Sequence, residues 1–316
     1  MIDDSRRPIG RYLNFPEARR AYARGENVTL HLRRQLDVSA NTPEIVEIAY
    51  DLQAGSYVEH ANSHSETIQK YAGETARILS PYVTADTSIL DVGCGELTTL
   101  THLMNRLEAH RGPILAFDIS WSRLRIGGNY ASSRMKREVY ARLGLFAAEI
   151  GEIPFPDKSI DVIISSHALE PNHGREKELL GEILRVARRY AVLFEPSYEL
   201  NSAEGRARME KHGYVRGLEA TATGLGAKVV DVVPLTCIAN PLNPTAAFIL
   251  EPPSDAGRSG NDLAFSDPGS SSLLVKREGY YFSPERGVSY PIIEGIPILR
   301  SSAAVLTSAL ASDVKD

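Results

Sequence analysis

The stretch that decides the fold is Ile89-Leu-Asp-Val-Gly-Cys-Gly-Glu-Leu, residues 89–97. Its apolar start predicts a short buried strand, and Gly93 and Gly95 then permit backbone angles and close approaches that side chains would forbid. We expect a helix to start near Glu96, so that its unpaired N–H groups and the positive end of its dipole face the loop. A strand, a glycine loop and a helix in this order predict a site for an anionic group such as a carboxylate.

A second acid follows at the end of the next expected strand, in Phe117-Asp118. Beside the glycine loop of a doubly wound sheet, such an acid can accept hydrogen bonds from both hydroxyls of a ribose. Glu149 stands in the same way after the third expected strand. A dinucleotide-binding loop would carry a third glycine, but Leu97 and Thr98 occupy that region, which weighs against NAD or FAD as the ligand.

Apolar, β-branched runs alternate with helical patterns along the chain, after an upstream helix that starts at Asn41-Thr-Pro-Glu. The expected strands are Ser88–Val92, Pro113–Phe117, Leu143–Ala148, Asp161–Ser165, Ala191–Glu195, Val229–Val233 and Ala246–Leu250. The other expected helices are Ser65–Leu79, Thr98–Glu108, Trp121–Tyr130, Glu176–Arg189 and Ser202–His212. This alternation predicts an α/β fold with an open, mainly parallel sheet of seven strands and helices on both faces.

Pattern and composition divide the chain into four segments. Residues 1–70 are expected to form an N-terminal helical extension, and residues 71–253 the α/β domain. Pro, Ser, Gly and Asp dominate residues 254–272, as is typical of a linker. Residues 273–316 are expected to form a small β-module and a tail.

Composition narrows the class of protein further. The net charge of −5 gives no sign of a nucleic-acid partner. The two cysteines, Cys94 and Cys237, have no ligand-spaced neighbours, so neither a disulfide framework nor a metal site is expected. No apolar run approaches the roughly 18 residues of a membrane span, and no signal peptide is recognisable. We therefore expect a cytoplasmic protein without a membrane partner.

Residues 71–250 resemble the class I S-adenosylmethionine (SAM)-dependent methyltransferases of the UbiE-like, small-molecule type. Residues 90–95 match the first motif of that family, and Glu149-Ile-Gly-Glu-Ile-Pro-Phe-Pro resembles its third. The fourth motif corresponds to Ile164-Ser-Ser-His-Ala-Leu-Glu-Pro-Asn. The resemblance implies a Rossmann-like fold, SAM as the cofactor and methyl transfer as the activity.

The resemblance also implies roles for individual residues. Asp118 would bind the ribose, while Glu149, where Asp is commoner, would bind the adenine amino group beside the backbone of Ile150. Tyr50-Asp-Leu-Gln-Ala-Gly-Ser-Tyr57 resembles a segment that closes over the cofactor, the alternative being an ordinary amphipathic helix with surface tyrosines. The expected cofactor-binding residues are Asp91, Gly93, Cys94, Gly95, Asp118, Ile119, Glu149, Ile150, Ser166, Tyr50 and Tyr57.

Candidate catalytic groups cluster after the fourth and fifth expected strands. Methyl transfer from a sulfonium is an in-line displacement, so a general base is needed only if the acceptor must lose a proton early. His167 is the preferred base because imidazole titrates near neutral pH, although a structural histidine is the alternative. Glu170 and Tyr198 are the other catalytic candidates. Arg175 would either hold an anionic group or be solvated.

The segment Tyr281–Leu299 resembles the end of the Trm112-like family, which often carries a Cys-x-x-Cys zinc knuckle. Here Ser266-Asp-Pro-Gly and Ser283-Pro-Glu-Arg-Gly stand at the knuckle positions without any cysteine. Because a structural zinc would lack thiolates, we expect a metal-free β-module. It would serve as a lid, as a dimer contact or in substrate selection, so a homo-oligomer is one of the expected assemblies.

The leading hypothesis is a SAM-dependent methyltransferase acting on a small or medium polar acceptor, such as a sugar, a nucleotide-sugar or a specialised metabolite. RNA or protein methylation is an alternative, because Trm112-like modules accompany such enzymes. The acidic balance argues against RNA, and the fourth motif lacks the Asn/Asp-Pro-Pro-Tyr signature of amino-directed enzymes. A non-catalytic SAM-binding scaffold and SAM chemistry without methyl transfer also stay open.

Overall fold

The computed structural model describes residues 14–238, 240–254 and 263–313. Residues 255–262, inside the predicted linker, and residues 1–13 of the predicted N-terminal extension lie outside the described residues. Within the described part of the chain, no helix is both long enough and apolar enough to span a bilayer.

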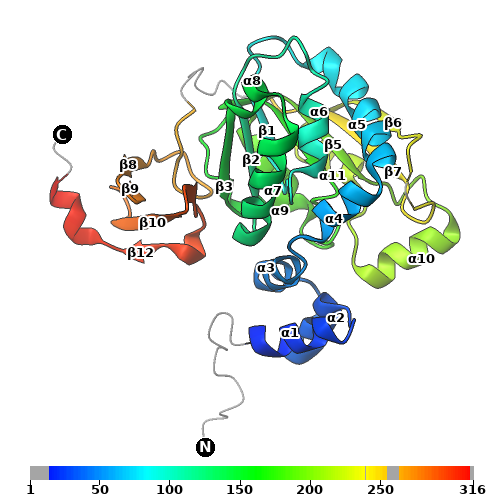
Figure 1. Cartoon of the computed structure of the whole chain (residues 1–316), viewed down its shortest axis with the longest axis horizontal. Coiled ribbons are helices and arrows are strands. Elements are labelled where there is room, and N and C mark those ends of the chain that lie inside the picture. The colour runs from blue at the N-terminus through cyan, green and yellow to red at the C-terminus, as the bar shows by residue number, and fades with distance from the viewer. Residues whose placement is uncertain (1–13, 239, 255–262, 314–316) are drawn as a thin grey trace, which may run out of the picture.

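A seven-stranded sheet forms the centre of the molecule (Figure 1). Its strands are β1 (Ile89–Val92), β2 (Ile114–Asp118), β3 (Leu143–Ala147), β4 (Ile160–Ser166), β5 (Ala187–Pro196), β6 (Lys228–Pro234) and β7 (Thr245–Glu251). The strand order is β3-β2-β1-β4-β5-β7-β6, and β7 runs antiparallel to the other six strands of this sheet. The predicted Rossmann-like, mainly parallel sheet is therefore confirmed. Its order reverses at β1, so the carboxyl ends of β1 and β4 open a crevice between them.

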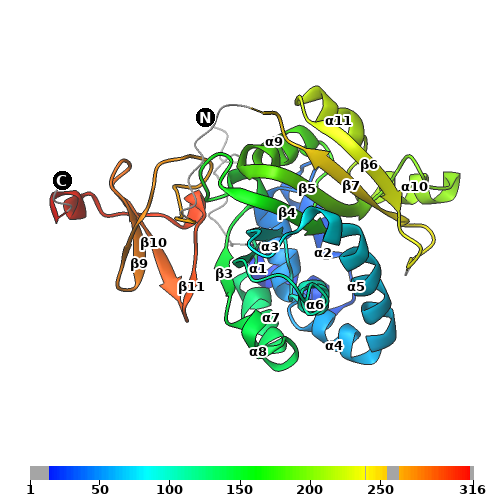
Figure 2. The same ribbon diagram turned by 90° about the horizontal axis from the view of Figure 1, so that it is seen from above.

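Helices cover both faces of this sheet, as Figure 2 shows from above. One face carries α5 (Ser65–Leu79), α6 (Thr98–Met104), α7 (Trp121–Arg134) and α8 (Arg137–Tyr140), and the other carries α9 (Glu176–Val186) and α11 (Leu218–Gly224). Side chains alternate along β1. Ile89 therefore packs in the core under α5 to α8, while Leu90 and Val92 pack in the core under α9 and α11. A strand buried on both faces reads as the apolar run seen in the sequence.

Three helix ends differ from the prediction, and one of them is that of Trp121–Tyr130, which continues to Arg134. The expected helix Glu176–Arg189 ends at Val186, because the backbone from Ala187 onward pairs with β4 and begins β5. Arg188 is held at this point by the carboxylate of Asp161, at 2.6 Å. Similarly, the expected helix Thr98–Glu108 ends at Met104. Helix α10 (Ala203–His212) agrees closely with its prediction.

The N-terminal part is helical, as predicted. It contains α1 (Phe15–Ala23), α2 (Val28–Leu36), α3 (Pro43–Leu52) and α4 (Ser56–Ser63). At the predicted start of α3, Thr42 is the N-cap and its hydroxyl accepts the N–H of Ile45. Ile45 and Ile48 then pack with Leu32 of α2 in a small separate core. Helix α3 contacts α7, and α4 contacts α6 and α7, which brings this part over the first motif.

The C-terminal part is a small antiparallel sheet of β8 (Val275–Arg277), β9 (Tyr280–Ser283), β10 (Val288–Ile293), β11 (Ile296–Pro297) and β12 (Val305–Leu306). It joins the central sheet at the β3 edge, where Leu299 donates its N–H to the carbonyl of Ala147 at 2.7 Å. Phe265 packs against Phe146 and Phe155 with ring centroids 5.0 and 5.1 Å away. The small sheet thereby protects the edge of β3.

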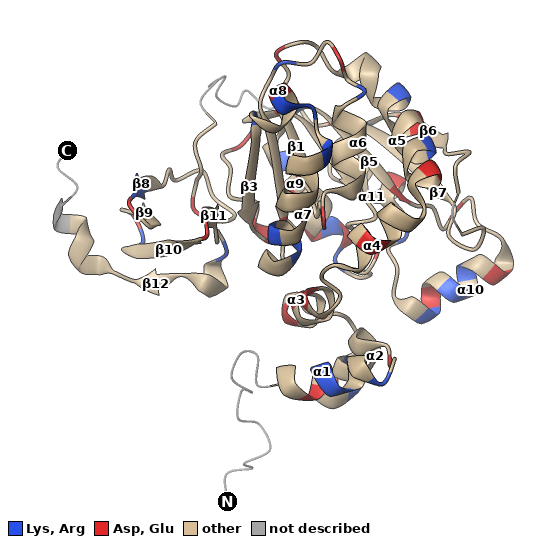
Figure 3. Cartoon of the chain, in the orientation of Figure 1, with Lys and Arg blue, Asp and Glu red and all other residues tan. Residues whose placement is uncertain are grey.

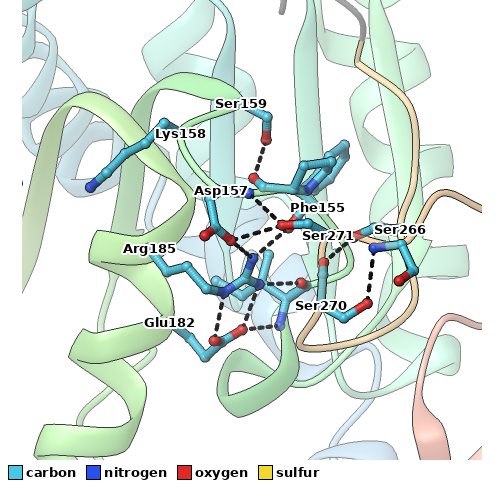
Figure 4. Close-up of polar contacts among 12 residues, drawn as sticks. Phe155, Asp157, Lys158, Ser159, Glu182, Arg185, Ser266, Ser270 and Ser271 are labelled. Atoms are coloured by element: carbon cyan, nitrogen blue, oxygen red, sulfur yellow. Dashed lines mark hydrogen bonds and ion pairs between the residues drawn. The ribbon is translucent and has the colours of Figure 1, made fainter. Parts of the chain in front are cut away.

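Polar contacts beside these rings fix the same junction (Figure 4). Arg185 of α9 donates to the carbonyl of Phe155 and to the carboxylate of Asp157, at 2.8 and 2.9 Å. The hydroxyl of Ser271 donates to the same carboxylate at 3.0 Å. Ser266 donates its N–H to the carbonyl of Pro154 at 3.1 Å. The Pro-Phe-Pro-Asp segment of the third motif therefore anchors the C-terminal part.

The two cysteine-free knuckle positions meet around a buried carboxylate. Asp267 accepts hydrogen bonds from the hydroxyls of Ser283 and Tyr290, the latter at 2.9 Å. Burial, the hydrogen bond to Asp267 and its charge together raise the pKa of Tyr290. Among the described residues, no group of three or more His, Cys, Asp or Glu is arranged to hold a metal ion. The metal-free module and the Trm112-like relationship stay predictions.

Candidate functional site

A cavity lies at the carboxyl ends of β1 to β4, where the switch in strand order predicts one. It has about 950 Å³ of empty volume, with the open solvent at its mouth included. All the residues predicted to bind a cofactor line it: Tyr50, Tyr57, Asp91, Gly93, Cys94, Gly95, Asp118, Ile119, Glu149, Ile150 and Ser166. The structure thus brings together segments that are spread over residues 50–166.

The glycine loop is folded so that only glycine fits at its two key positions. Gly93 and Gly95 have φ angles of +66° and +56°, in the left-handed region. A β-carbon on Gly93 would stand 2.4 Å from that of Ala168, and one on Gly95 would stand 2.8 Å from Arg123. The two glycines leave a cradle for a ligand that approaches the backbone closely.

Asp118 is held in place by the loop that it faces. One carboxylate oxygen accepts the N–H of Gly95 and the other accepts the N–H of Ser120, both at 2.9 Å. Each oxygen keeps a further lone pair for a ligand hydroxyl. Asp91 lies nearby at the end of β1, where burial and then the charges of Asp118 and Glu195 raise its pKa well above the ordinary value.

A buried arginine that sequence reasoning missed lies in the same cavity. Arg123, in the first turn of α7, lies between the rings of Tyr50 and Tyr57, whose centroids are 4.9 and 4.4 Å from its guanidinium carbon. Its charge is flanked by Asp118 and Glu96, at 4.0 and 3.8 Å. The two tyrosines therefore line the cavity, and Tyr57 is at the same time 45% exposed. The only sequence signal was a charged residue in the helix after Asp118.

Glu96 fastens the N-terminal helices to the glycine loop. Its buried carboxylate accepts the N–H groups of Gly55 and Val58, at 2.9 and 2.7 Å. These donors stand at the start of α4, where a carboxylate is also favoured by the helix dipole. The segment from Tyr50 to Tyr57 is thereby fixed over the cavity.

The other end of the cavity carries an ion pair. Arg175 lines the cavity and donates to both Glu149 and Glu178, so its guanidinium is engaged by two carboxylates. Burial raises the pKa of Glu149 although Arg175 opposes the shift. The carboxylate of Glu149 is therefore shared with a neighbour that the sequence pattern did not connect to it.

His167 lies where β4 ends, and both of its ring nitrogens have partners. Nδ1 is 2.7 Å from Glu170 and Nε2 is 2.9 Å from the hydroxyl of Thr245. Its φ of +56° is unusual for a residue with a side chain, and marks a backbone held by its surroundings. Burial alone would lower the pKa of His167, but the hydrogen bond and charge of Glu170 outweigh it and raise the value.

Glu195 of β5 holds the loop that carries His167. The carboxylate is fully buried and accepts the N–H groups of Ala168, Leu169 and Glu170, at 3.0 to 3.2 Å. The hydroxyl of Ser165 donates to it as well, at 2.7 Å. Burial raises the pKa of Glu195 to about 7 against the effect of these donors. This residue positions the loop and does not face the cavities.

A second cavity lies on the far side of His167, with about 600 Å³ of empty volume including open solvent. It is lined by His60, Thr67, Ile68, Tyr71, His167, Cys237, Asn240, Asn243 and Thr245. His167 lines both cavities, and the hydroxyls of Tyr71 and Ser166 meet at 2.9 Å beside it. Apart from His167, none of these residues was singled out from the sequence, because they come from distant segments.

Tyr198, one of the predicted catalytic residues, lies elsewhere. Its hydroxyl donates to Glu210 of α10 at 2.6 Å, and it lines neither cavity. The predicted strand end is correct, but the chain turns outward after Pro196 and carries the ring away from the crevice. Glu170, in contrast, contacts His167 directly.

Comparisons with known proteins agree with this geometry. Residues 84–212, which include β1 to β5 and the glycine loop, match the family model of a methyltransferase domain. No curated protein matches the chain. Residues 84–212 thus match a methyltransferase domain, and the cavity with its glycine cradle and Asp118 has the features expected of a SAM site.

Solved structures share the fold at low identity. The 4+2 cyclase SpnF is 13% identical with a TM-score of 0.50, covering 68% of this chain and 98% of its own. Magnesium protoporphyrin IX methyltransferase from Synechocystis PCC 6803 is also 13% identical, with a TM-score of 0.46 and coverages of 59% and 84%. A methyltransferase from Methanosarcina mazei is 15% identical, with a TM-score of 0.46 and coverages of 55% and 96%. At these identities the likeness concerns the fold alone.

Proposed function

We propose that this chain transfers the methyl group of SAM to a small or medium, uncharged polar acceptor that enters the second cavity. The observation that carries the proposal is that His167 lines both cavities. A methyl group can pass in line only where the cofactor and acceptor compartments meet. The Ser166–Tyr71 contact marks the same boundary.

The cofactor would occupy the first cavity. Asp118 would accept the ribose hydroxyls, and the backbone at Gly93 and Gly95 would approach the rest of the molecule closely. Glu149 and Ile150 would meet the adenine, with Arg175 holding the carboxylate of Glu149 in place. When bound, SAM supplies a methyl group activated by its sulfonium, and the sulfur becomes a neutral thioether once the methyl group is transferred. Tyr50 and Tyr57 would cover it from the N-terminal side.

The composition of the second cavity supports an uncharged acceptor. Its described lining residues include hydroxyls, amides and two imidazoles, but neither Lys, Arg, Asp nor Glu. A phosphate in this cavity would lack a cationic partner there. An uncharged acceptor therefore suits this cavity better than the phosphate part of a nucleotide-sugar does.

His167 would accept the acceptor's proton at Nε2. Its Nδ1 faces the carboxylate of Glu170, which fixes the tautomer with the proton on Nδ1 and leaves Nε2 as the acceptor. A substrate hydroxyl would take over the position from which Thr245 now contacts Nε2. Glu195 would keep the whole loop in register by holding three of its N–H groups.

The charge distribution favours this acceptor class over RNA. Figure 3 shows Lys and Arg interspersed with Asp and Glu along the described helices, for example on α10. Sequence-independent RNA binding needs a continuous basic surface.

Tritium-labelled SAM and extract fractions test the proposal. The purified chain would be incubated with a small-molecule filtrate, with total RNA and with denatured protein, and SAM-derived tritium would be followed through nuclease and protease treatment. We expect label in the nuclease- and protease-resistant small-molecule fraction. Label that nuclease or protease releases would assign the alternative substrates. SAM binding without transfer to any fraction would favour the scaffold hypothesis.

A further inference from the structure

Among the described residues that line the cofactor cavity, Arg123 is the one cation without a hydrogen-bonded carboxylate. The lining includes two arginines, and Arg175 is engaged by Glu149 and Glu178 at the other end. The side chain of Arg123 is 7% exposed. A buried cation without a hydrogen-bonded anion is costly, so an anionic partner supplied by the ligand is expected.

The two acids beside Arg123 do not fill that place. Asp118 already accepts the N–H groups of Gly95 and Ser120, and its nearest contact with the guanidinium is 4.0 Å. Glu96 already accepts two N–H groups of α4, and it lies 3.8 Å from Nε of Arg123. Both distances exceed that of a hydrogen bond, so the two acids balance the charge of the guanidinium without hydrogen-bonding to it.

The residues around the guanidinium of Arg123 favour an anionic group that belongs to the ligand. The guanidinium lies under the rings of Tyr50 and Tyr57 and against the glycine loop, where a β-carbon on Gly95 would touch Nη2. The other charged groups at this end, Asp91, Glu96 and Asp118, are all acidic. SAM carries a sulfonium, an ammonium and one carboxylate, and only the carboxylate complements an arginine.

We propose that Arg123 binds the α-carboxylate of SAM and is held ready for it by the tyrosine pair and by Glu96. This inference rests on the proposed cofactor site, and it adds a residue that discriminates ligands with a carboxylate from those without one. Tyr57 and Tyr50 keep the fork of the guanidinium oriented, so that less freedom is lost when the ligand binds.

Calorimetry with three adenosine ligands tests the assignment. S-adenosylhomocysteine carries the carboxylate, its decarboxylated analogue lacks only that group, and methylthioadenosine lacks the whole amino-acid part. The wild-type chain should bind S-adenosylhomocysteine about 10- to 100-fold more tightly than the decarboxylated analogue. Arg123→Met should remove most of this difference and leave the affinity for methylthioadenosine within about threefold. Arg123→Lys should restore part of it, because a charge without the fork remains.

Arg125→Met is the matched control, because Arg125 stands on the same helix but pairs with the exposed Glu294. It should leave all three affinities unchanged. Equal loss for all three ligands in Arg123→Met would overturn the carboxylate assignment and point to the ribose. If Arg123→Met does not fold, the comparison of ligands on the wild-type chain decides. Equal binding of S-adenosylhomocysteine and its decarboxylated analogue would overturn this inference and leave the proposed cofactor site standing. Binding of none of the ligands by the wild type would overturn the proposed cofactor site as well.

Discussion

The two cavities that meet at His167 are built in different ways. The cofactor cavity takes Asp91, Gly93, Gly95 and Asp118 from the ends of β1 and β2 and the loop between them, and each lies where its motif predicts. The second cavity takes residues from α4, α5, β7, the loop after β4 and the segment before β7. A cofactor that is common to a class is bound by a contiguous motif, whereas an acceptor is bound by side chains that only the fold assembles. Function on the acceptor side is therefore the part that the family does not specify.

The sharpest way to separate the two cavities is to remove the group that they share. His167→Gln should lower kcat about 10²- to 10⁴-fold, because a general base contributes that much when the acceptor must lose a proton. Affinity for S-adenosylhomocysteine should change less than about threefold, since Gln can still hydrogen-bond at this place. Transfer of tritiated methyl groups to the identified acceptor, beside calorimetry, measures both. His31→Gln, far from the crevice on α2, is the control. An unchanged kcat would show that His167 is structural.

Asp118 should affect the cofactor side only. Asp118→Ala should weaken S-adenosylhomocysteine about 100-fold or more, because two hydroxyls lose a charged acceptor and the N–H groups of Gly95 and Ser120 lose theirs. Calorimetry measures the loss, and Asp231→Ala on exposed β6 should cause none. Unchanged affinity in Asp118→Ala would refute the ribose assignment.

Filling the second cavity should affect the acceptor side only. Ile68 of α5 lines that cavity, so Ile68→Trp should raise the acceptor KM about 10-fold or more by occupying the space. S-adenosylhomocysteine affinity should stay the same, because Ile68 does not line the first cavity. Glu66→Trp, exposed on the same helix, is the control. If Ile68→Trp instead lowers the affinity for S-adenosylhomocysteine, the two cavities do not act as separate sites for cofactor and acceptor.

The smallest expected effect is a shift in the pH dependence of kcat. A second histidine–glutamate pair in the chain provides the control. Glu170 raises the pKa of His167, so the neutral base appears only above that raised value and activity should rise with pH through it. Glu170→Gln removes the charge and should move this acid limb of the kcat profile to lower pH, with a loss of about 10-fold or less at the plateau. His173 and Glu176 form a pair at the same spacing and distance of 2.7 Å outside both cavities. Glu176→Gln should leave the limb unmoved, and a limb that also stays in place in Glu170→Gln would exclude His167 as the titrating group.

The prediction from sequence succeeded for properties that depend on residues adjacent in the chain. The positive φ of Gly93 and Gly95 and the place of Asp118 at a strand end are local properties, so the motif predicts them. The prediction that Tyr198 lies at the catalytic site failed. The loop after a strand can turn toward the crevice or away from it, and this loop carries Tyr198 away, toward α10. Arg123 was missed because its burial depends on Tyr50, Tyr57 and Glu96, none of them near it in the chain.

The ion pair between Arg300 and Glu47 shows the same limit at a larger scale. Arg300 of the C-terminal part lies 2.7 Å from Glu47 of α3 and donates to the carbonyl of Ile119 at 3.2 Å. It links both extensions to the loop that follows Asp118. Neither composition nor periodicity connects residues so far apart, since only the closed fold brings them together.

The sequence by itself determined the mainly parallel sheet, the glycine loop and the acid at the end of β2, which follow from hydrophobic periodicity and from backbone angles that glycine alone adopts readily. The resemblance of its motifs to class I methyltransferases added SAM as the expected cofactor. The tertiary structure decided that Arg175 pairs with Glu149, that Arg123 lies under two tyrosines and that His167 divides two cavities. Such contacts depend on burial and charge shared between distant segments, and their energies exist only once the chain is packed.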